Sequence, residues 1–318
     1  MSTYKQIAGT NIEVLSSDPA NPVDGQVWYN STSNTVKANF DNPGSWATGG
    51  NLNTARNRLA GAGTQTAALA FGGSSPPLSA LNESWNGTSW TEVNDLNTAR
   101  YQLAGAGADN TNALAFGGGT TPDTGATESW NGTSWTEVND LNTVRQQLAG
   151  CGIQTAALAI GGFPRTAVTE SWNGTSWTEV NDLNTARNVL AGIGVQTSAL
   201  AFGGNPNTAP INTGLTESWN GTNWTAVNDM NTGRESLAGA GADNTSALGF
   251  GGETFLAITE SWNGTSWTEV NDLNTAREFL AGAGTQTAAL AFGGDTPPST
   301  AATEEWSVGP KTITFTDS

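Results

Sequence analysis

The stretch Glu83-Ser-Trp-Asn-Gly-Thr-Ser-Trp-Thr-Glu-Val-Asn-Asp-Leu-Asn-Thr-Ala-Arg100 recurs almost unchanged along the chain. Its opening Glu-Ser-Trp-Asn-Gly returns four more times, and a degenerate sixth copy begins at Glu304. A second repeated segment, first seen at residues 59–73, lies between the copies. Internal repetition at a steady period outweighs other sequence signals, because repeated units bury their apolar surfaces against their neighbours.

The period and composition of the repeat predict β-structure. Successive arginines of its Asn-Thr-x-Arg motif lie 42–47 residues apart, which suits a four-stranded propeller blade or a pair of helices. Residues 59–63 and 67–71 alternate in side-chain size, and no segment sustains a 3.6-residue apolar period. Residues 81–85 and 90–93 flank an Asn-Gly turn, so Trp85 and Trp90 are expected to face each other across a hairpin. We predict an all-β chain with four strands per repeat.

The N-terminal residues lie outside the repeat, and the last repeat is incomplete. Residues 1–44 predict a short N-terminal β arm with strands near 12–15, 26–29 and 35–40. We therefore divide the chain into this arm, a candidate anchoring segment, and a six-repeat unit at 45–318. The arm either attaches the repeats to a larger assembly or packs on their rim. The last repeat lacks a fourth strand, and residues 45–50 and 311–316 both fit that place.

Paired glycines follow the second predicted strand of every copy, and an aromatic and a Trp follow later. The pairs are Gly72-Gly73, Gly117-Gly118, Gly161-Gly162, Gly203-Gly204, Gly251-Gly252 and Gly293-Gly294. Over residues 45–318 this order resembles kelch repeats, although Trp replaces the usual Tyr of the third strand. The resemblance implies a six-bladed kelch-like β-propeller with four-stranded blades. The whole chain, including residues 16–30, is similar to kelch-like structural proteins of marine bacteriophages.

Charge and composition exclude several classes of function. A net charge of −17 with only 11 cationic residues argues against nucleic-acid binding. The sequence has no His, which excludes His-based triads and the copper site of kelch-type oxidases. Cys151 takes a position that is Ala in most repeats and is expected in the core. We predict no catalytic residue, cofactor or metal, and neither a secretory signal nor a membrane-spanning segment.

The loop between the second and third strands varies sharply between copies. Such loops commonly carry recognition, and neutral drift is the competing explanation. The candidate recognition residues are Ser75, Pro77, Thr121, Asp123, Phe163, Arg165, Asn207, Ile211, Asn212, Phe255 and Thr296. By strand alternation, these loops share one face with the loops that connect successive repeats.

Each repeat also contributes one Arg and one Glu to that face. A guanidinium matches a carboxylate in geometry, so we predict a structural ring of partly buried Arg–Glu contacts, within or between blades. The residues are Arg56, Arg100, Arg145, Arg187, Arg234 and Arg277, with Glu83, Glu128, Glu170, Glu217, Glu260 and Glu304. Six equivalent carboxylates argue against the differentiated pair that acid–base catalysis needs.

Two further motifs have structural explanations. The five Asn-Gly-Thr sites match a glycosylation acceptor, but a hairpin turn accounts for them. The Asn-Asp-x-Asn segment after the fourth strand offers oxygen ligands for calcium, yet it lacks the fuller acidic pattern of a dedicated calcium loop. Side-chain capping of a turn is the better interpretation.

The resemblance and the composition together predict a non-enzymatic phage virion protein. In a tail fibre or similar appendage, it would present the propeller for host-surface attachment or structural assembly. Its expected partners are other virion proteins, through the arm, and a host-surface glycan or protein; homo-oligomerisation stays open. It would be made in the host cytoplasm and exposed to the extracellular medium in the virion. The alternative is a carbohydrate-binding propeller lectin that is not part of a virion.

Overall fold

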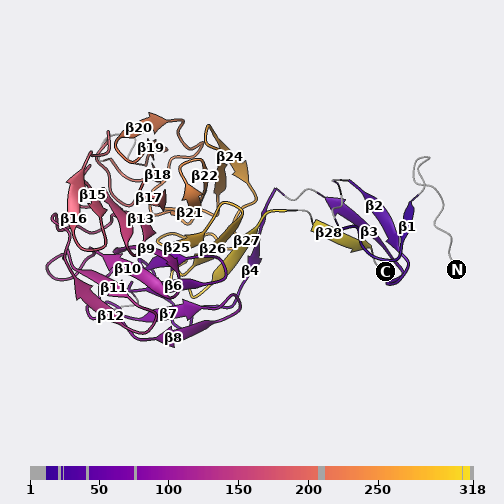
Figure 1. Ribbon diagram of the computed structural model, residues 1–318, viewed down its shortest axis with the longest axis horizontal. Coiled ribbons are helices and arrows are strands. Elements are labelled where there is room, and N and C mark those ends of the chain that lie inside the picture. Colours follow the sequence, from indigo (N-terminus) through magenta and orange to yellow (C-terminus); the bar gives the residue numbers. More distant parts are fainter. Residues whose placement is uncertain are drawn as a thin grey trace. The chain divides into compact units, whose positions relative to one another are not determined.

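The computed structural model describes residues 12–20, 23, 25–40, 43–74, 77–206, 212–309 and 311–315. All regular structure in these residues is β-strand, arranged as seven open four-stranded sheets (Figure 1). The all-β prediction is therefore confirmed. Within these ranges no helix is long and apolar enough to cross a membrane. The chain divides into a unit formed by Trp46–Ser307 and a second unit formed by Met1–Ser45 with Val308–Ser318.

Six of the sheets form the Trp46–Ser307 unit, one for each repeat. Their first strands are β5 (Ala60–Gly63), β9 (Ala104–Asp109), β13 (Ala149–Ile153), β17 (Ala191–Val195), β21 (Ala238–Asp243) and β25 (Ala281–Gly284). Their second strands are β6 (Ala68–Phe71), β10 (Asn112–Phe116), β14 (Ala156–Ile160), β18 (Ser198–Phe202), β22 (Ser246–Phe250) and β26 (Ala288–Phe292). Their third strands are β7 (Asn82–Trp85), β11 (Thr127–Trp130), β15 (Thr169–Trp172), β19 (Thr216–Trp219), β23 (Thr259–Trp262) and β27 (Thr303–Ser307). Their fourth strands are β8 (Trp90–Val93), β12 (Trp135–Val138), β16 (Trp177–Val180), β20 (Trp224–Val227), β24 (Trp267–Val270) and β4 (Ser45–Thr48).

The hydrophobic core lies between neighbouring sheets, where large side chains of one sheet meet small ones of the next. Leu69 and Phe71 of β6 pack against Ala113 and Ala115 of β10. The close approach explains the glycine in the first strand, because a Cβ at Gly105 would lie 2.6 Å from the ring of Phe71. Alternating large and small residues therefore set the spacing between the sheets.

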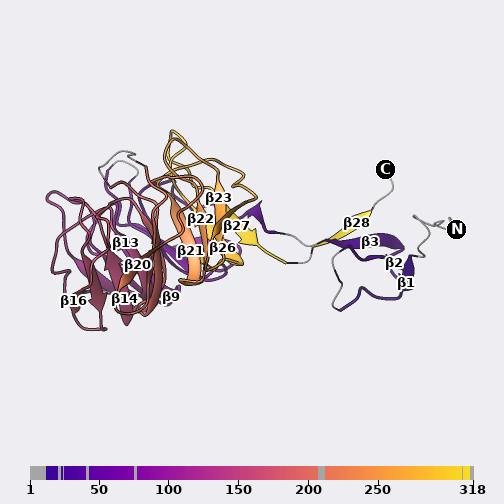
Figure 2. The ribbon, with the colours of Figure 1, turned by 90° about the horizontal axis from the view of Figure 1, so that it is seen from above.

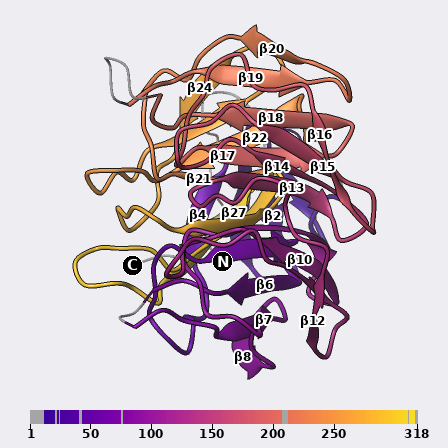
Figure 3. The ribbon, with the colours of Figure 1, turned by 90° about the vertical axis from the view of Figure 1, so that its left-hand side faces the viewer.

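The succession of sheets returns to its starting point. Each first strand lies beside the first strand of the next sheet, and β25 lies beside β5 (Figure 1). Phe292 of the last sheet shares a buried cluster with Ala68 and Trp85 of the first. In the edge-on views the strands run between two layers of connecting loops (Figures 2 and 3). This is a repeated, propeller-like arrangement.

Tryptophans fill the space between the third and fourth strands. Trp85 and Trp90 are cross-strand partners with ring centres 5.3 Å apart, as the hairpin predicted. The second indole usually also bonds to the preceding sheet, as when Trp224 Nε1 donates to Thr169 Oγ1 at 3.1 Å. Trp135 breaks this rule, because the equivalent acceptor position holds Asn82. Neither Trp135 Nε1 nor Asn82 Oδ1 has a hydrogen-bond partner, and both atoms are buried.

The last sheet takes its fourth strand from the other end of the repeats. Strand β4 pairs beside β27, and Trp46 lies 5.4 Å from Trp306, ring centre to ring centre. Trp46 Nε1 also donates to Thr259 Oγ1 (3.0 Å) in the preceding sheet. Residues 311–316, the competing candidate, contain no Trp that could replace Trp46. The expected unit at 45–318 is corrected accordingly, since its compact part ends at Ser307.

The other unit is a separate four-stranded sheet. It consists of β1 (Glu13–Leu15), β2 (Val27–Asn30), β3 (Thr35–Phe40) and β28 (Lys311–Phe315), in that order. Trp28 is fully buried, and Asp18 accepts hydrogen bonds from Trp28 Nε1 (3.0 Å) and Lys37 Nζ (2.6 Å). The hydrogen bond from Lys37 is the main reason that the pKa of Asp18 falls to about 2. The predicted β arm therefore exists, but it includes the C-terminal strand.

Replacing Asn82 with Thr is expected to stabilise the protein by about 1 kcal/mol. The hydroxyl would accept the orphaned Trp135 N–H, and only a 3.2 Å bond from Asn82 to the exposed Asn94 carbonyl would be lost. Urea denaturation measures the change. The reverse substitution, Thr169→Asn, removes the acceptor for Trp224 and should destabilise by a similar amount. Equal stability of Asn82→Thr and the wild type would contradict this account.

Candidate functional site

The connectors between successive sheets combine a constant frame with a variable pair of residues. The frame is the Arg of the repeat on one side and Leu-Ala-Gly on the other. The enclosed pairs differ in all six copies: Asn57-Arg58, Tyr101-Gln102, Gln146-Gln147, Asn188-Val189, Glu235-Ser236 and Glu278-Phe279. The connectors are thus a place where otherwise nearly identical repeats differ in sequence.

The second residue of every pair has a left-handed backbone. The φ angles run from 48° at Val189 to 58° at Ser236, a region that costs energy for non-glycine residues and most for β-branched ones. Each backbone N–H donates to the carbonyl of its counterpart in the preceding sheet, at 2.8–3.0 Å. The bond from Arg58 to Phe279 joins the first sheet to the last and completes a cycle of six. This cycle holds the residues in place.

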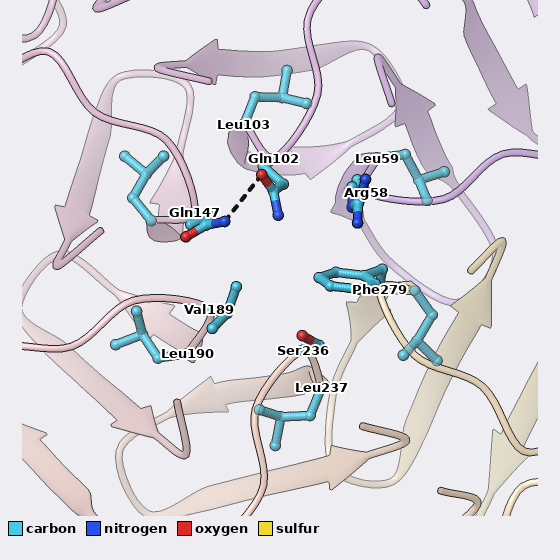
Figure 4. Close-up of a pocket in the computed structure, with 12 residues that line it drawn as sticks. Arg58, Leu59, Gln102, Leu103, Gln147, Val189, Leu190, Ser236, Leu237 and Phe279 are labelled. Atoms are coloured by element: carbon cyan, nitrogen blue, oxygen red, sulfur yellow. Dashed lines mark hydrogen bonds between the residues drawn. The ribbon is translucent and has the colours of Figure 1, made fainter. Parts of the chain in front are cut away.

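Six side chains from this cycle surround a hollow of about 90 Å³, which we call the axial mouth (Figure 4). They belong to Arg58, Gln102, Gln147, Val189, Ser236 and Phe279.

The axial mouth is chemically two-sided. Arg58, Gln102 and Gln147 are consecutive around it, and Val189 and Phe279 belong to the other half (Figure 4). Gln147 Nε2 donates to Gln102 Oε1 at 3.2 Å. The guanidinium of Arg58 lies over the ring of Phe279, 4.6 Å from its centre, in a cation–π contact. One half therefore offers hydrogen-bond donors, and the other offers the apolar surface of Val189 and Phe279 with the hydroxyl of Ser236 between them.

A second hollow of about 360 Å³, here the side hollow, adjoins the axial mouth. The two share Gln147, Val189, Ser236 and Phe279. The remaining wall of the side hollow comes from the connectors and from the loops that follow β14 and β18: Gln146, Phe163, Arg165, Asn188, Asn205 and Glu235. Its size falls within the range of pockets that hold small ligands.

Burial shifts the titration of two carboxyl groups on this face. The pKa of Glu235 is raised, chiefly by burial and further by nearby Glu253, while Asn205 and Arg165 oppose the rise. Burial is also the main cause of the raised pKa of Glu278, which Arg58 partly offsets. Carboxylates in such surroundings interact strongly with any hydrogen-bond donor that reaches them.

The structure brings some of the predicted recognition residues together. Phe163 and Arg165 line the side hollow, and the Asp123 carboxylate accepts hydrogen bonds from the Gln146 amide at 3.1 and 3.2 Å. Ser75, Asn207 and Ile211 lie outside the described residues. The remaining candidates belong to loops on the same face but do not line these two hollows: Pro77, Thr121, Asn212, Phe255 and Thr296.

Sequence reasoning missed the axial mouth. The variable residue pairs were a usable signal, since aligning the six copies shows that they differ as much as the longer loops do. The left-handed backbone had no signal, because none of the six positions holds Gly or Asn, the residues that usually mark it.

All six predicted Arg–Glu pairs form salt bridges, each within one sheet. In the second sheet, Arg100 Nη2 lies 3.0 Å from Glu128 Oε1. The other oxygen, Oε2, accepts bonds from the backbone and side-chain nitrogens of Asn97, at 2.7 and 2.9 Å. The connector that enters each sheet is thereby tied to its third strand at two points.

These pairs are more deeply buried than predicted. No arginine or glutamate side chain among them is more than 3% exposed. Burial lowers the pKa of several of these arginines, to about 10 for Arg277, where Glu304 opposes the effect. Arg277 therefore stays charged at neutral pH. The six equivalent pairs form a structural ring.

The turn motifs use their polar groups in backbone hydrogen bonds. Asp95 Oδ1 accepts from the Asn82 amide at 3.2 Å, and Asn94 Nδ2 donates to the Thr133 carbonyl at 2.8 Å. Asn86 Oδ1 accepts from the amides of Thr88 and Ser89 at 2.9 and 3.0 Å. In the part of the chain that the structure describes, no three His, Cys, Asp or Glu side chains are grouped to hold a metal. Cys151 is buried, and burial raises the pKa of its thiol to about 12.

Comparisons of the chain with protein-family models and with curated proteins find no match. The functional reading therefore depends on the geometry of this face and on the pattern of the repeats.

Replacing Arg145 with Met is expected to destabilise the protein by about 3–5 kcal/mol, because it leaves Glu170 buried without its counter-charge. Arg165→Met is the matched control, since Arg165 is exposed and its loss should change stability by under about 0.5 kcal/mol. Chemical denaturation of both variants compares them directly. Similar stabilities would show that the buried pair is not a structural requirement.

Replacing Glu235 with Gln is expected to stabilise the protein at pH 7 and to have little effect near pH 3. An acid with a raised pKa binds its proton more tightly when folded, so its contribution to stability falls as pH rises above the unfolded value of 4.5 towards the folded pKa. The uncharged amide removes that loss. Melting temperatures of both proteins across this pH range test the prediction. A pH-independent difference would contradict it.

Proposed function

We propose that Trp46–Ser307 is a six-bladed, kelch-like β-propeller and that it acts as a non-enzymatic binding module. We further propose that the whole chain is a bacteriophage virion protein, in a tail fibre or a similar appendage. There it would present the propeller for host-surface attachment or structural assembly. The six successive sheets, the cycle that joins the last to the first, and the kelch-like order of glycines and aromatics support the first part.

One observation carries the binding role. The copies are nearly identical where they build the scaffold, and they differ where they line the axial mouth and the side hollow. A purely structural ring gains nothing from five different residue types at six positions with a strained backbone conformation. Recognition does gain, because each side chain can contact a different part of a ligand.

The charged groups of the repeats favour binding over catalysis. The equivalent glutamates each have an arginine partner and hydrogen-bond to their connector. The absence of His from the sequence removes the commonest general base at neutral pH. Catalysis by two carboxyl groups needs a pair that differs in environment and stands at a suitable separation.

The separate sheet formed by β1, β2, β3 and β28 suits attachment to other virion proteins. It contains both ends of the described chain and leaves β1 and β28 as its edge strands. Val14 and Phe315, on these edges, are 66% and 53% exposed. An exposed edge with apolar side chains can pair with a strand of another protein.

Two measurements test the proposal. Mass spectrometry of purified phage particles from the same source should detect the protein, whereas its absence from the particles would favour a lectin that is not part of a virion.

In a binding assay with host cells, Phe163→Ala combined with Asn188→Ala should weaken binding about tenfold or more. Ile153→Ala, at the opposite end of β13, is the exposed control and should bind like the wild type. Unchanged binding by the double variant, at an unchanged melting temperature, would refute a role for this face.

A further inference from the structure

The repeat unit is almost without free positive charge, and the exceptions meet at one place. Residues 46–307 contain eight cationic side chains, all of them arginines. Six are buried in the Arg–Glu pairs. The other two, Arg58 and Arg165, line the axial mouth and the side hollow. In a protein of net charge −17, both arginines outside the buried pairs thus belong to adjoining hollows, where Glu278 lies near Arg58 and Glu235 near Arg165.

Arg58 is held in a state that leaves it able to bind an anion. Phe279 covers one face of its guanidinium, and within the described residues no carboxylate forms a salt bridge with it. Its Nε is buried and has no hydrogen-bond partner, so the edge left for a ligand is the one formed by Nη1 and Nη2. A guanidinium that is stacked on a ring keeps its edge for a planar, two-oxygen acceptor such as a carboxylate.

The other residues of the two hollows favour a ligand that carries hydroxyl groups and apolar surface in addition to a carboxylate. Gln102 and Gln147 line the axial mouth, where the Gln147 amide already bonds to Gln102 and Asn188. In the side hollow, Asn188 Oδ1 and Glu235 Oε2 are buried and have no hydrogen-bond partner. Oxygen acceptors such as Glu235 require a ligand that carries donors, which hydroxyl groups provide. Phe163 and Phe279 supply apolar faces beside these polar groups. Hydroxyls, apolar C–H faces and a carboxylate occur together in acidic sugars.

We propose that these hollows bind an acidic saccharide, with a carboxylate at Arg58 in the axial mouth and an adjoining sugar unit in the side hollow. This inference rests on the proposed binding function and specifies its ligand class. The four residues shared by the two hollows make the site continuous, so one ligand can reach both. The overall negative charge of the protein disfavours approach of any anion, and salt screens that repulsion while the direct contact persists.

A glycan array that contains acidic glycans beside their neutral counterparts tests the ligand class with the full-length protein. The acidic member of at least one matched pair should bind, and its neutral counterpart should bind about tenfold more weakly or not at all. Calorimetry with trigalacturonate and its neutral methyl ester gives the same comparison in solution, and inorganic phosphate serves as a plain anion.

Arg58→Gln is the informative variant for any acidic glycan that binds. Gln already occupies the equivalent position at Gln102 and Gln147 with the same backbone conformation, so the fold should tolerate it. It should weaken binding of the acidic glycan about tenfold and leave a neutral one unaffected. Arg165→Gln gives an independent measurement if Arg58→Gln folds poorly. Lys37→Gln, in the other unit, removes the same charge and should bind normally.

The outcomes separate this inference from the proposed function. Binding of neutral glycans or of a protein at this face, lost in Phe163→Ala and retained in Arg58→Gln, would overturn the acidic saccharide and preserve the binding module. Equal affinity for inorganic phosphate and for trigalacturonate would also overturn it, since the sugar would then contribute nothing. No acidic glycan bound above its neutral counterpart would overturn it as well. Host binding that is indifferent to every variant of this face would refute the proposed function itself.

Discussion

The buried ion pair between the arginine of each connector and the glutamate of the third strand is the constraint on which the repeat unit depends. In the second sheet, the Glu128 carboxylate holds Arg100 with one oxygen and Asn97 with the other, so that a single side chain fixes two points of the same connector. An unpaired charge in these surroundings would cost several kcal/mol. The connector therefore has one position relative to its sheet, and the residues that follow the arginine start from a fixed point.

From that fixed point the chain enters the cycle of six backbone hydrogen bonds. A bond between backbone groups places no demand on the side chain, and this is why Arg58, Val189 and Phe279 can occupy equivalent positions with nearly equal φ angles. The left-handed conformation costs about 1–3 kcal/mol at such residues, and it persists because the ion pair on one side and the buried leucine on the other leave the backbone no alternative. Contacts of the scaffold thus offset the cost of the left-handed backbone, and the side chains of the axial mouth can differ between copies.

The sequence allowed the fold to be predicted wherever the information was local or repeated. Alternating side chains gave the strands, the Asn-Gly turn placed Trp85 opposite Trp90, and equal numbers of arginines and glutamates gave the ion pairs. Contacts between distant residues were not predictable in the same way. Residues 45–50 and 311–316 have equally good strand patterns, and the choice depends on whether Trp46 can reach Thr259 and Trp306. The axial mouth was missed because its conformation is imposed by neighbouring sheets and not by residue type.

A ring of identical repeats would present the same side chain six times around its axis, and only a symmetric partner could be distinguished by it. Here the symmetry is broken at few positions: Arg58, Gln102 and Gln147 make one half of the axial mouth polar, and Val189 and Phe279 make the other mainly apolar beside the hydroxyl of Ser236. The side hollow is also asymmetric, because none of the other equivalent loops contains an arginine like Arg165, and a Phe directly follows the paired glycines only at Phe163. The residues that break the symmetry are not those that hold the sheets together. Changes in recognition and changes in stability therefore fall on separate sets of residues, so substitutions in the axial mouth can alter the ligand while the buried ion pairs keep the frame unchanged.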